Sequence, residues 1–237
     1  MLTSNRSNTK RWIALTFALS ISLVSCNSRE SSLNLDPYHF DRQLLPLESS
    51  AKWGYVDRSG RVVIPPKYDE AAEFSNGYAV VTLNKKSGVI DKTGKLTVPL
   101  VYDTIIGEVY KGVVPFCSGN CSYDSNDGRW GFLRVADGSM VVHPKYGDAS
   151  AFSEDLAPFC IGQCHEHSEG EGVNWHMVEA TGKWGFVDLN GKEAIAAQFD
   201  KVTPFFRGVA AVTLGKSDQA RHGYIDTRGS FIVGPSN

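Results

Sequence analysis

The sequence predicts an all-β protein built as an open, solenoid-like array of about five short hairpin or meander repeats. One glycine recurs in steps of 34, 43, 54 and 38 residues, at Gly54, Gly88, Gly131, Gly185 and Gly223. The segments around these glycines read as short strands separated by turns. No window shows a sustained apolar period of 3.6 residues, which argues against long helices.

The first repeat shows how each unit is read. Lys52–Asp57 is aromatic and β-branched, as strands are, and a glycine-containing turn follows it. We expect the return strand, Arg61–Ile64, to end at Pro65-Pro66, because proline cannot donate to a strand ladder. A loop or helical turn around Tyr68 should lead to a third strand over residues 78–83.

Both ends of the array are incomplete. Residues 38–47 loosely match the second half of a unit, and the last copy, which begins at His222, supplies only a first half. Together the two halves would complete one more unit, as in a small closed propeller-like arrangement. An open stack with half-units as caps explains the same observation, and it is the arrangement we favour.

The repeated motif is (Lys/Arg)-Trp-Gly-(Tyr/Phe)-(Ile/Val)-Asp-x-x-Gly-(Lys/Arg), with a downstream Pro-x-Tyr-Asp. It resembles the signature of the WG-repeat family of bacterial proteins over about residues 52–235. Ser87 and His222 depart from it where tryptophan is expected. The resemblance implies a β-rich repeat scaffold, often on secreted or surface proteins, with no established common activity.

The first residues are typical of a secretory signal: a basic segment, then an apolar run from Trp12 to Val24. The run ends in Leu-Val-Ser-Cys, which resembles the lipobox of bacterial lipoproteins. In that family the chain is cut before the cysteine, here Cys26, which is then lipid-modified. The alternatives are a helix of the mature fold and a plain transmembrane anchor, for which the run is short.

The lipoprotein interpretation divides the chain into a signal peptide (1–25), a lipidated N-terminus with a linker (26–37) and a repeat domain (38–237). It predicts an extracytoplasmic protein of the bacterial cell envelope that is tethered to a membrane by its N-terminal lipid. Asn27, where an aspartate would favour retention in the inner membrane, indicates the outer membrane if the organism has one.

Charge argues against nucleic acid as a partner. Removal of residues 1–25 leaves 21 basic against 26 acidic residues, and no basic stripe stands out. A mildly acidic surface repels phosphate backbones. No cofactor motif is present, and we expect no cofactor.

Four cysteines follow Cys26 in two copies of Pro-Phe-Cys-x-Gly-x-Cys, which suits disulfides in an oxidising compartment. We predict the local pairs Cys117–Cys121 and Cys160–Cys164, while pairings between units stay open. The alternative is a zinc site with four thiolates, or with ligands from the nearby histidines His165, His167 and His176.

The most polar segment of the repeat domain follows the last cysteine and lies in the longest step of the array. Loops on rigid scaffolds often carry binding, and its acidic, imidazole and indole groups suit a partner surface. A solvated loop without a role is the alternative. The candidate partner-binding residues are His165, Glu166, His167, Glu169, Trp175 and His176.

Two other recurring residue types are interpreted structurally. Trp53, Trp130 and Trp184 hold the same place in their units, which favours shared core positions over an aromatic ligand platform. The repeated turn aspartates are expected to accept backbone N–H groups and not to form a carboxylate site. They are Asp57, Asp91, Asp188 and Asp226.

No Gly-x-Ser-x-Gly, phosphate-binding loop or His-Glu-x-x-His motif is present, so the sequence points to no catalytic residue. We predict a surface that binds or scaffolds a protein or a cell-wall component. The alternative function is an extracytoplasmic, hydrolase-like enzyme with a site in the insertions at residues 117–128 or 160–180.

Overall fold

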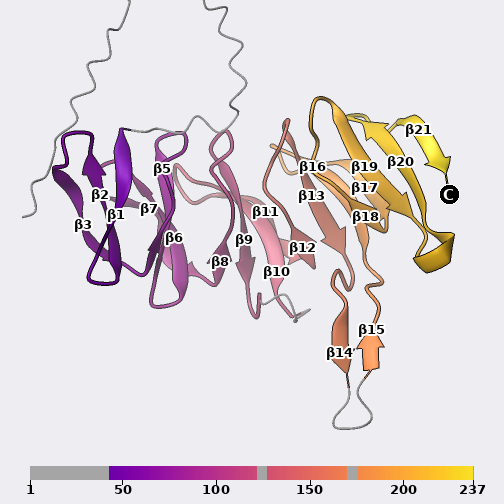
Figure 1. The fold of residues 1–237 in the computed structure, drawn as a ribbon, viewed down its shortest axis with the longest axis horizontal. Helices are drawn as coiled ribbons and strands as arrows, with labels where there is room; N and C mark the ends of the chain where they lie inside the picture. Colours follow the sequence, from indigo (N-terminus) through magenta and orange to yellow (C-terminus); the bar gives the residue numbers. More distant parts are fainter. Residues whose placement is uncertain (1–42, 122–126, 170–175, 237) are drawn as a thin grey trace, which may run out of the picture. The chain divides into compact units, whose positions relative to one another are not determined.

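The computed structural model describes residues 43–121, 127–169 and 176–236. Within these residues the chain is built from β-strands, and its helical structure is one 3₁₀ turn, η2 (Ser217–Gln219). The strands form five main antiparallel sheets and a separate two-stranded hairpin (Figure 1). The all-β prediction is confirmed.

The five main sheets follow one another in chain order and share one plan. The first sheet consists of β1 (Leu44–Ser49), β2 (Lys52–Asp57) and β3 (Val62–Tyr68). The later sheets add a two-residue strand at one edge. The second sheet consists of β4 (Glu70–Ala71), β5 (Tyr78–Leu83), β6 (Lys86–Asp91) and β7 (Leu96–Tyr102), and the third of β8 (Thr104–Ile105), β9 (Val113–Ser118), β10 (Arg129–Arg134) and β11 (Met140–Tyr146). The fourth consists of β12 (Asp148–Ala149), β13 (Leu156–Ile161), β16 (Lys183–Asp188) and β17 (Glu193–Phe199). The fifth has the same order: β18 (Lys201–Val202), β19 (Val209–Leu214), β20 (Arg221–Asp226) and β21 (Phe231–Ser236). The separate hairpin is β14 (His167–Glu169) with β15 (His176–Val178).

Each sheet combines two neighbouring sequence repeats. The third strand of one repeat pairs with the first strand of the next, as β5 does with β6. At the start of the array, β1 takes the place of a third strand and pairs with β2. At the end, β20 and β21 supply the first half of a unit. Because β1 and β21 belong to different sheets, the array is the predicted open stack and not a closed propeller.

The hydrophobic core lies between successive sheets. One cluster joins Tyr55 and Ile64 of the first sheet to Ala79 and Ile90 of the second. Three further clusters join the second sheet to the third, the third to the fourth and the fourth to the fifth. Burial between sheets is the main favourable term in such a stack, since each sheet alone has two faces and no interior.

The return strand runs through the prolines and does not end before them. β3 extends from Val62 to Tyr68, and the register between β2 and β3 shifts on either side of Tyr55. β3 is the edge strand of its sheet, so the missing proline N–H groups leave no ladder bond unmade. The loop or helical turn predicted around Tyr68 is also wrong, since Tyr68 ends β3 and the short strand β4 begins at Glu70.

The three repeated tryptophans are equivalent but not equally buried. Trp53, Trp130 and Trp184 oppose Tyr68, Tyr146 and Phe199, respectively, at the same step of their hairpins. Trp130 is buried, whereas Trp53 and Trp184 are half-buried at the rim of their clusters. The innermost aromatic position is two residues later, as at Phe186, because that residue faces the middle of the next sheet.

The turn aspartates bind backbone N–H groups as predicted. Asp57 Oδ1 accepts from the N–H groups of Ser59 (2.9 Å) and Arg61 (3.1 Å). The equivalent pairs of contacts recur at Asp91, Asp188 and Asp226. These carboxylates close the turns between the first two strands of their units.

Acid is expected to weaken the fold. The Ser59 side chain and backbone N–H groups lower the pKa of Asp57 from 3.8 to about 2, and hydrogen bonds to Thr93 lower the pKa of Asp91. A carboxyl with a lowered folded-state pKa stabilises fully above its unfolded pKa, and the contribution disappears as pH falls through the folded value. Urea midpoints should therefore decrease between about pH 4 and pH 2. The double variant D57N/D91N should show a shallower decrease, and an unchanged slope would contradict this assignment.

Candidate functional site

All long insertions replace the same turn of the repeat. The turns between β1 and β2 and between β5 and β6 contain two residues each, with positive φ at Asn84 and Lys85 as in a type I′ turn. The next three connections are longer, yet the flanking pairs keep the same register, with Ile161 opposite Lys183. We call this side of the stack the loop edge. Its connections are residues 50–51, 84–85, 119–128, 162–182 and 215–220.

A repeated ion pair supports the loop edge. Lys183 Nζ lies 2.6 Å from Asp200, whose other oxygen accepts the N–H of Gly215 at 2.8 Å. Burial raises the pKa of Asp200, but these hydrogen bonds outweigh it and the pKa lies below its usual value. Lys52 pairs with Asp69 and Lys86 with Asp103 in the same way. In each pair, the aspartate also accepts a hydrogen bond from the first residue of a loop-edge connection, and this holds the base of that connection to the sheet.

In the third repeat a disulfide loop replaces this ion pair. Gly147 stands where the aspartate would be, and a Cβ there would lie 2.4 Å from the Gly162 oxygen and 2.7 Å from Cys164 Sγ. A side chain at position 147 would therefore overlap with the loop. The Gly147 N–H donates to the Cys160 oxygen of β13 at 2.9 Å, as the N–H groups of Asp69 and Asp200 do to Thr82 and Thr213 in their units, so the backbone keeps its course without the aspartate.

The four cysteines form two local pairs. The S–S distance is 2.09 Å between Cys117 and Cys121 and 2.16 Å between Cys160 and Cys164. This agrees with the predicted local pairing, and not with sulfurs that gather around one zinc ion. Among the described residues, no group of three or more metal-ligating side chains converges. The cysteines thus close the two longest connections at their base.

The first hollow of the loop edge lies between the two disulfide loops. It measures about 250 Å³, and its lining includes Asn120, Trp130, Asp148 and His165. His165 Nε2 lies 3.1 Å from Asp148 Oδ2, and both side chains are about one-sixth exposed. Burial raises the pKa of Asp148 above its usual value, and the neighbouring imidazole of His165 offsets only part of this effect. This pair fixes the residue after Cys164 against the start of β12.

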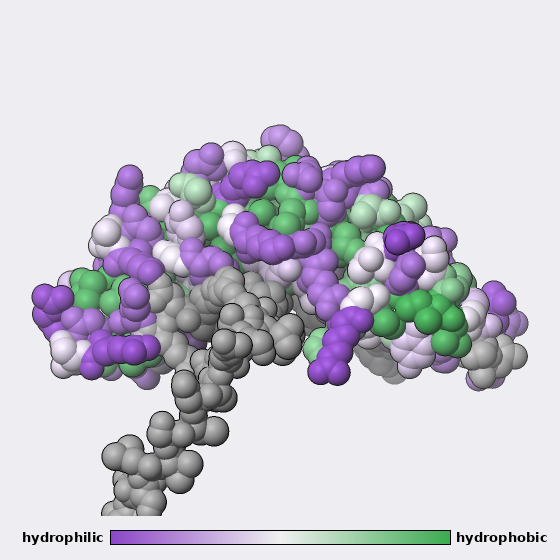
Figure 2. Space-filling view, turned by 90° about the horizontal axis from the view of Figure 1, so that it is seen from above, coloured by the Kyte–Doolittle hydropathy of each residue, from purple (hydrophilic) through white to green (hydrophobic). Residues whose placement is uncertain are grey.

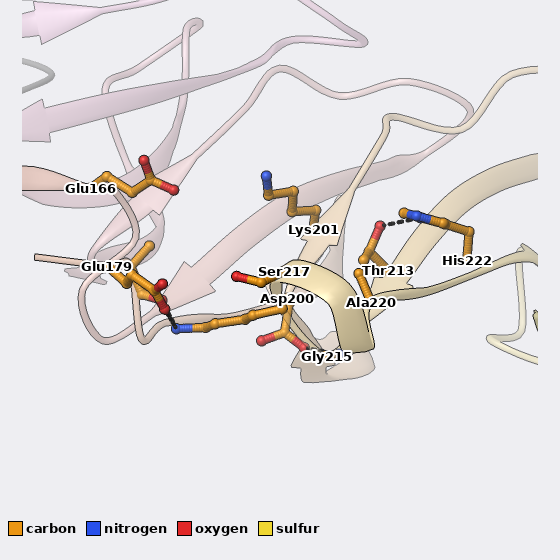
Figure 3. A pocket seen from close by; sticks show the side chains of 11 residues that line it. Glu166, Glu179, Asp200, Lys201, Thr213, Gly215, Ser217, Ala220 and His222 are labelled. Carbon is orange, nitrogen blue, oxygen red and sulfur yellow. Dashed lines mark hydrogen bonds and ion pairs between the residues drawn. The ribbon is translucent and has the colours of Figure 1, made fainter. Parts of the chain in front are cut away.

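The second hollow lies between the base of the β14–β15 hairpin and the last sheet (Figure 3). It measures about 310 Å³. Glu166 and Lys201 line it from different elements, and Lys216 Nζ lies 3.7 Å from a carboxylate oxygen of Glu179. His222 Nδ1 lies 3.1 Å from Thr213 Oγ1. The hollow thus presents both an acidic and a basic group to a ligand.

The structure divides the predicted partner-binding residues between these places. His165 lines the first hollow and Glu166 the second. His167, Glu169 and His176 belong to the strands of the hairpin. Trp175 and the lipidation residue Cys26 lie outside the described residues.

Sequence reasoning missed Asp148, Lys201 and Glu179, which the structure brings to the hollows. The signal at Asp148 was its position one residue after the usual aspartate, since Gly147 occupies the place that the aspartate holds in the other units. Lys201 and Glu179 carry no such departure from the repeat.

The sequence matches the WG containing repeat over four segments that together exceed half of the chain: residues 53–86, 88–120, 130–163 and 184–216. The chain belongs to the WG containing repeat family. Each WG segment begins one or two residues into the first strand of a unit, and it ends in or directly after the connection that follows the third strand. The insertions of the loop edge therefore fall between or at the ends of WG segments.

Two solved structures are similar to this WG-repeat chain. One is a crystal structure described as the eukaryotic initiation factor, at 12% identity and a TM-score of 0.46. The alignment covers 82% of this chain and 52% of the other, so the chain spans about half of that protein's length. The other is a protein of unknown function from Bacteroides caccae, at 14% identity and a TM-score of 0.31, with 82% and 78% covered. No curated protein matches the chain.

Proposed function

We propose that this WG-repeat protein is a lipid-anchored protein of the bacterial envelope that binds a protein or cell-wall partner through its loop edge. The observation that carries the proposal is that every long insertion replaces the same two-residue turn. The repeats therefore act as a scaffold that gathers three variable connections on one side. Disulfides and ion pairs hold the bases of these connections.

The distribution of titratable groups supports binding over hydrolysis. A hydrolytic site needs its acid, base and nucleophile within reach of one substrate atom. Asp148 and His165 lie in one hollow. In the other, Glu179 pairs with Lys216 at 3.7 Å, and among the described residues no carboxylate makes a hydrogen bond to His222 that would orient it as a base. The four cysteines of the insertions are bridged and offer no thiolate.

A loop replacement tests the binding role. In one variant, residues 162–182 are replaced by Asn-Lys, the pair that joins β5 to β6, and Cys160 by alanine. A second variant makes the same replacement at residues 119–128, with Cys117→Ala, and shows how the binding is shared between the two connections. Both should fold, because a two-residue turn closes the same register. Binding to purified cell-wall sacculi, or crosslinking to envelope proteins, should fall at least tenfold in the first variant. Unchanged binding in both variants would exclude the loop edge.

Anchoring is tested separately. Cys26→Ala should block lipid attachment and release the protein from the membrane fraction, because the thiol is the acceptor of the lipid. Mass spectrometry of the protein isolated from envelopes should find a lipid on Cys26 at the mature N-terminus. A mature protein that begins at another residue and carries no lipid would rule out this anchor.

No helix among the described residues is long and apolar enough to cross a membrane.

A further inference from the structure

The last sheet exposes a face that every earlier sheet buries. Tyr224 and Val233 oppose each other on β20 and β21 and are 50% and 52% exposed. Their equivalents in the first four sheets are at most 7% exposed, because the next sheet covers them. These equivalents are Tyr55 and Ile64, Val89 and Val98, Phe132 and Val142, and Phe186 and Ile195.

The turn before β19 differs from the equivalent turns, in which a side chain makes a hydrogen bond to the next unit, as the Tyr110 hydroxyl does to Asp155 at 3.2 Å. Ser75 donates to the Val109 oxygen of the next unit at 3.1 Å, and Ser153 donates to the Phe205 oxygen at 2.6 Å. The equivalent residue of the fourth unit is Phe206, which makes the same bridge with the first residue of its third strand and is 71% exposed. An apolar ring thus stands where a link to the next unit would begin.

We call Phe206, Tyr224 and Val233 the last-sheet face. Figure 2 views one side of the stack, and a hydrophobic area lies toward the end that holds β20 and β21 in Figure 1. Terminal units of stacked repeats usually carry a polar outer face that keeps the protein soluble. The last-sheet face lacks this polar cover, and exposed apolar patches of this kind mark interaction sites.

The first sheet exposes the opposite half of the same interface. Leu45 is 44% exposed, and Leu47 and Val56 are half-buried. Their equivalents in the second sheet, Ala79, Val81 and Ile90, are buried against Tyr55 and Ile64. We call Leu45, Leu47 and Val56 the first-sheet face.

We propose that the last-sheet face of one molecule packs on the first-sheet face of a second copy of this chain, head to tail. The contact would repeat an interface that the chain already forms four times between its own sheets. It is heterologous, because two different faces meet, and it leaves one free face at each end for further copies. This inference concerns the ends of the stack and does not depend on the loop edge.

Crosslinking of the full chain in its own envelope tests this assembly. Chains that carry both Leu45→Cys and Tyr224→Cys are treated with a short bismaleimide crosslinker and should give a ladder of dimers, trimers and longer products. The matched control carries Leu45→Cys and Met140→Cys, since Met140 is an equally exposed apolar residue of a middle sheet. This control should give no ladder. Adding Phe206→Asp to the first chain should reduce its ladder at least tenfold.

Chains with one introduced cysteine show whether the last-sheet face is covered by a first-sheet face, by another last-sheet face or by a different protein. Chains with Leu45→Cys alone and chains with Tyr224→Cys alone should crosslink only when they are expressed together. Products of Tyr224→Cys with itself would show that two last-sheet faces meet and would overturn the head-to-tail arrangement. Products with a different protein, or none above the Met140 control, would overturn the second copy as the occupant. All substituted residues are exposed, so the variants should retain the fold.

Discussion

Replacement of Phe186 by alanine should lower the free energy of unfolding by about 3–5 kcal/mol, the usual range for the loss of a core aromatic side chain. Phe186 is fully buried between the fourth and fifth sheets and contacts the ring of Phe205, with centroids 4.7 Å apart. Urea unfolding, followed by tryptophan fluorescence, measures the change.

Two variants calibrate this result. Phe206→Ala removes the same side chain from an exposed position and should change stability by no more than about 0.5 kcal/mol in the monomer. Trp184→Ala should fall between the two, because Trp184 is half-buried at the rim. A larger effect at Trp184 than at Phe186 would restore tryptophan as the central core residue.

Gly185→Ala should destabilise the protein by about 3 kcal/mol, at the upper end of the cost of overpacking. A Cβ at this position would lie 2.5 Å from the Ile195 oxygen and 2.7 Å from the Ala197 nitrogen. Both are backbone atoms of the return strand β17, so no rotamer change relieves the overlap. This close approach explains why glycine follows the tryptophan position in every unit.

The chain offers a graded series for this test. At Gly223 the nearest atom to a Cβ is 2.9 Å away, so Gly223→Ala should cost less than Gly185→Ala. Gly234 has no atom within 4 Å of a Cβ, and its alanine variant should unfold like the unchanged protein. Circular dichroism melts measure all three. Equal melting temperatures for the Gly185 and Gly234 variants would show that the return strand yields to the added methyl group.

The repeat scaffold was predictable because its information is periodic. The strands, the turn aspartate and the close-packed glycine recur at fixed offsets within each unit. The assignment of strands and turns in one copy is therefore supported by the other copies. The course of β3 through Pro65-Pro66 was not predictable, since the edge position that tolerates proline depends on the pairing of whole strands. Local propensity alone ends the strand at the first proline.

The hollows of the loop edge were harder to predict for a related reason. Asp148 meets His165, and Glu166 faces the same space as Lys201, only because separate connections fold against neighbouring sheets. No fixed offset encodes such contacts. The core placement of the tryptophans was predictable from their recurrence, but the difference in their burial was not. All three hold the second position of their strands, yet only Trp130 is buried, in a cluster that includes Cys117 and Cys121 of a disulfide loop.

The offset between sequence repeat and sheet determines how this protein can be divided or lengthened. A segment cut from one Trp-Gly to the next contains strands of two different sheets and completes neither. A segment cut after β3 and again after β7 contains one whole sheet, β4 to β7, with all three of its connections. The natural module for excision, duplication or grafting is therefore displaced by about half a unit from the repeat that the sequence displays.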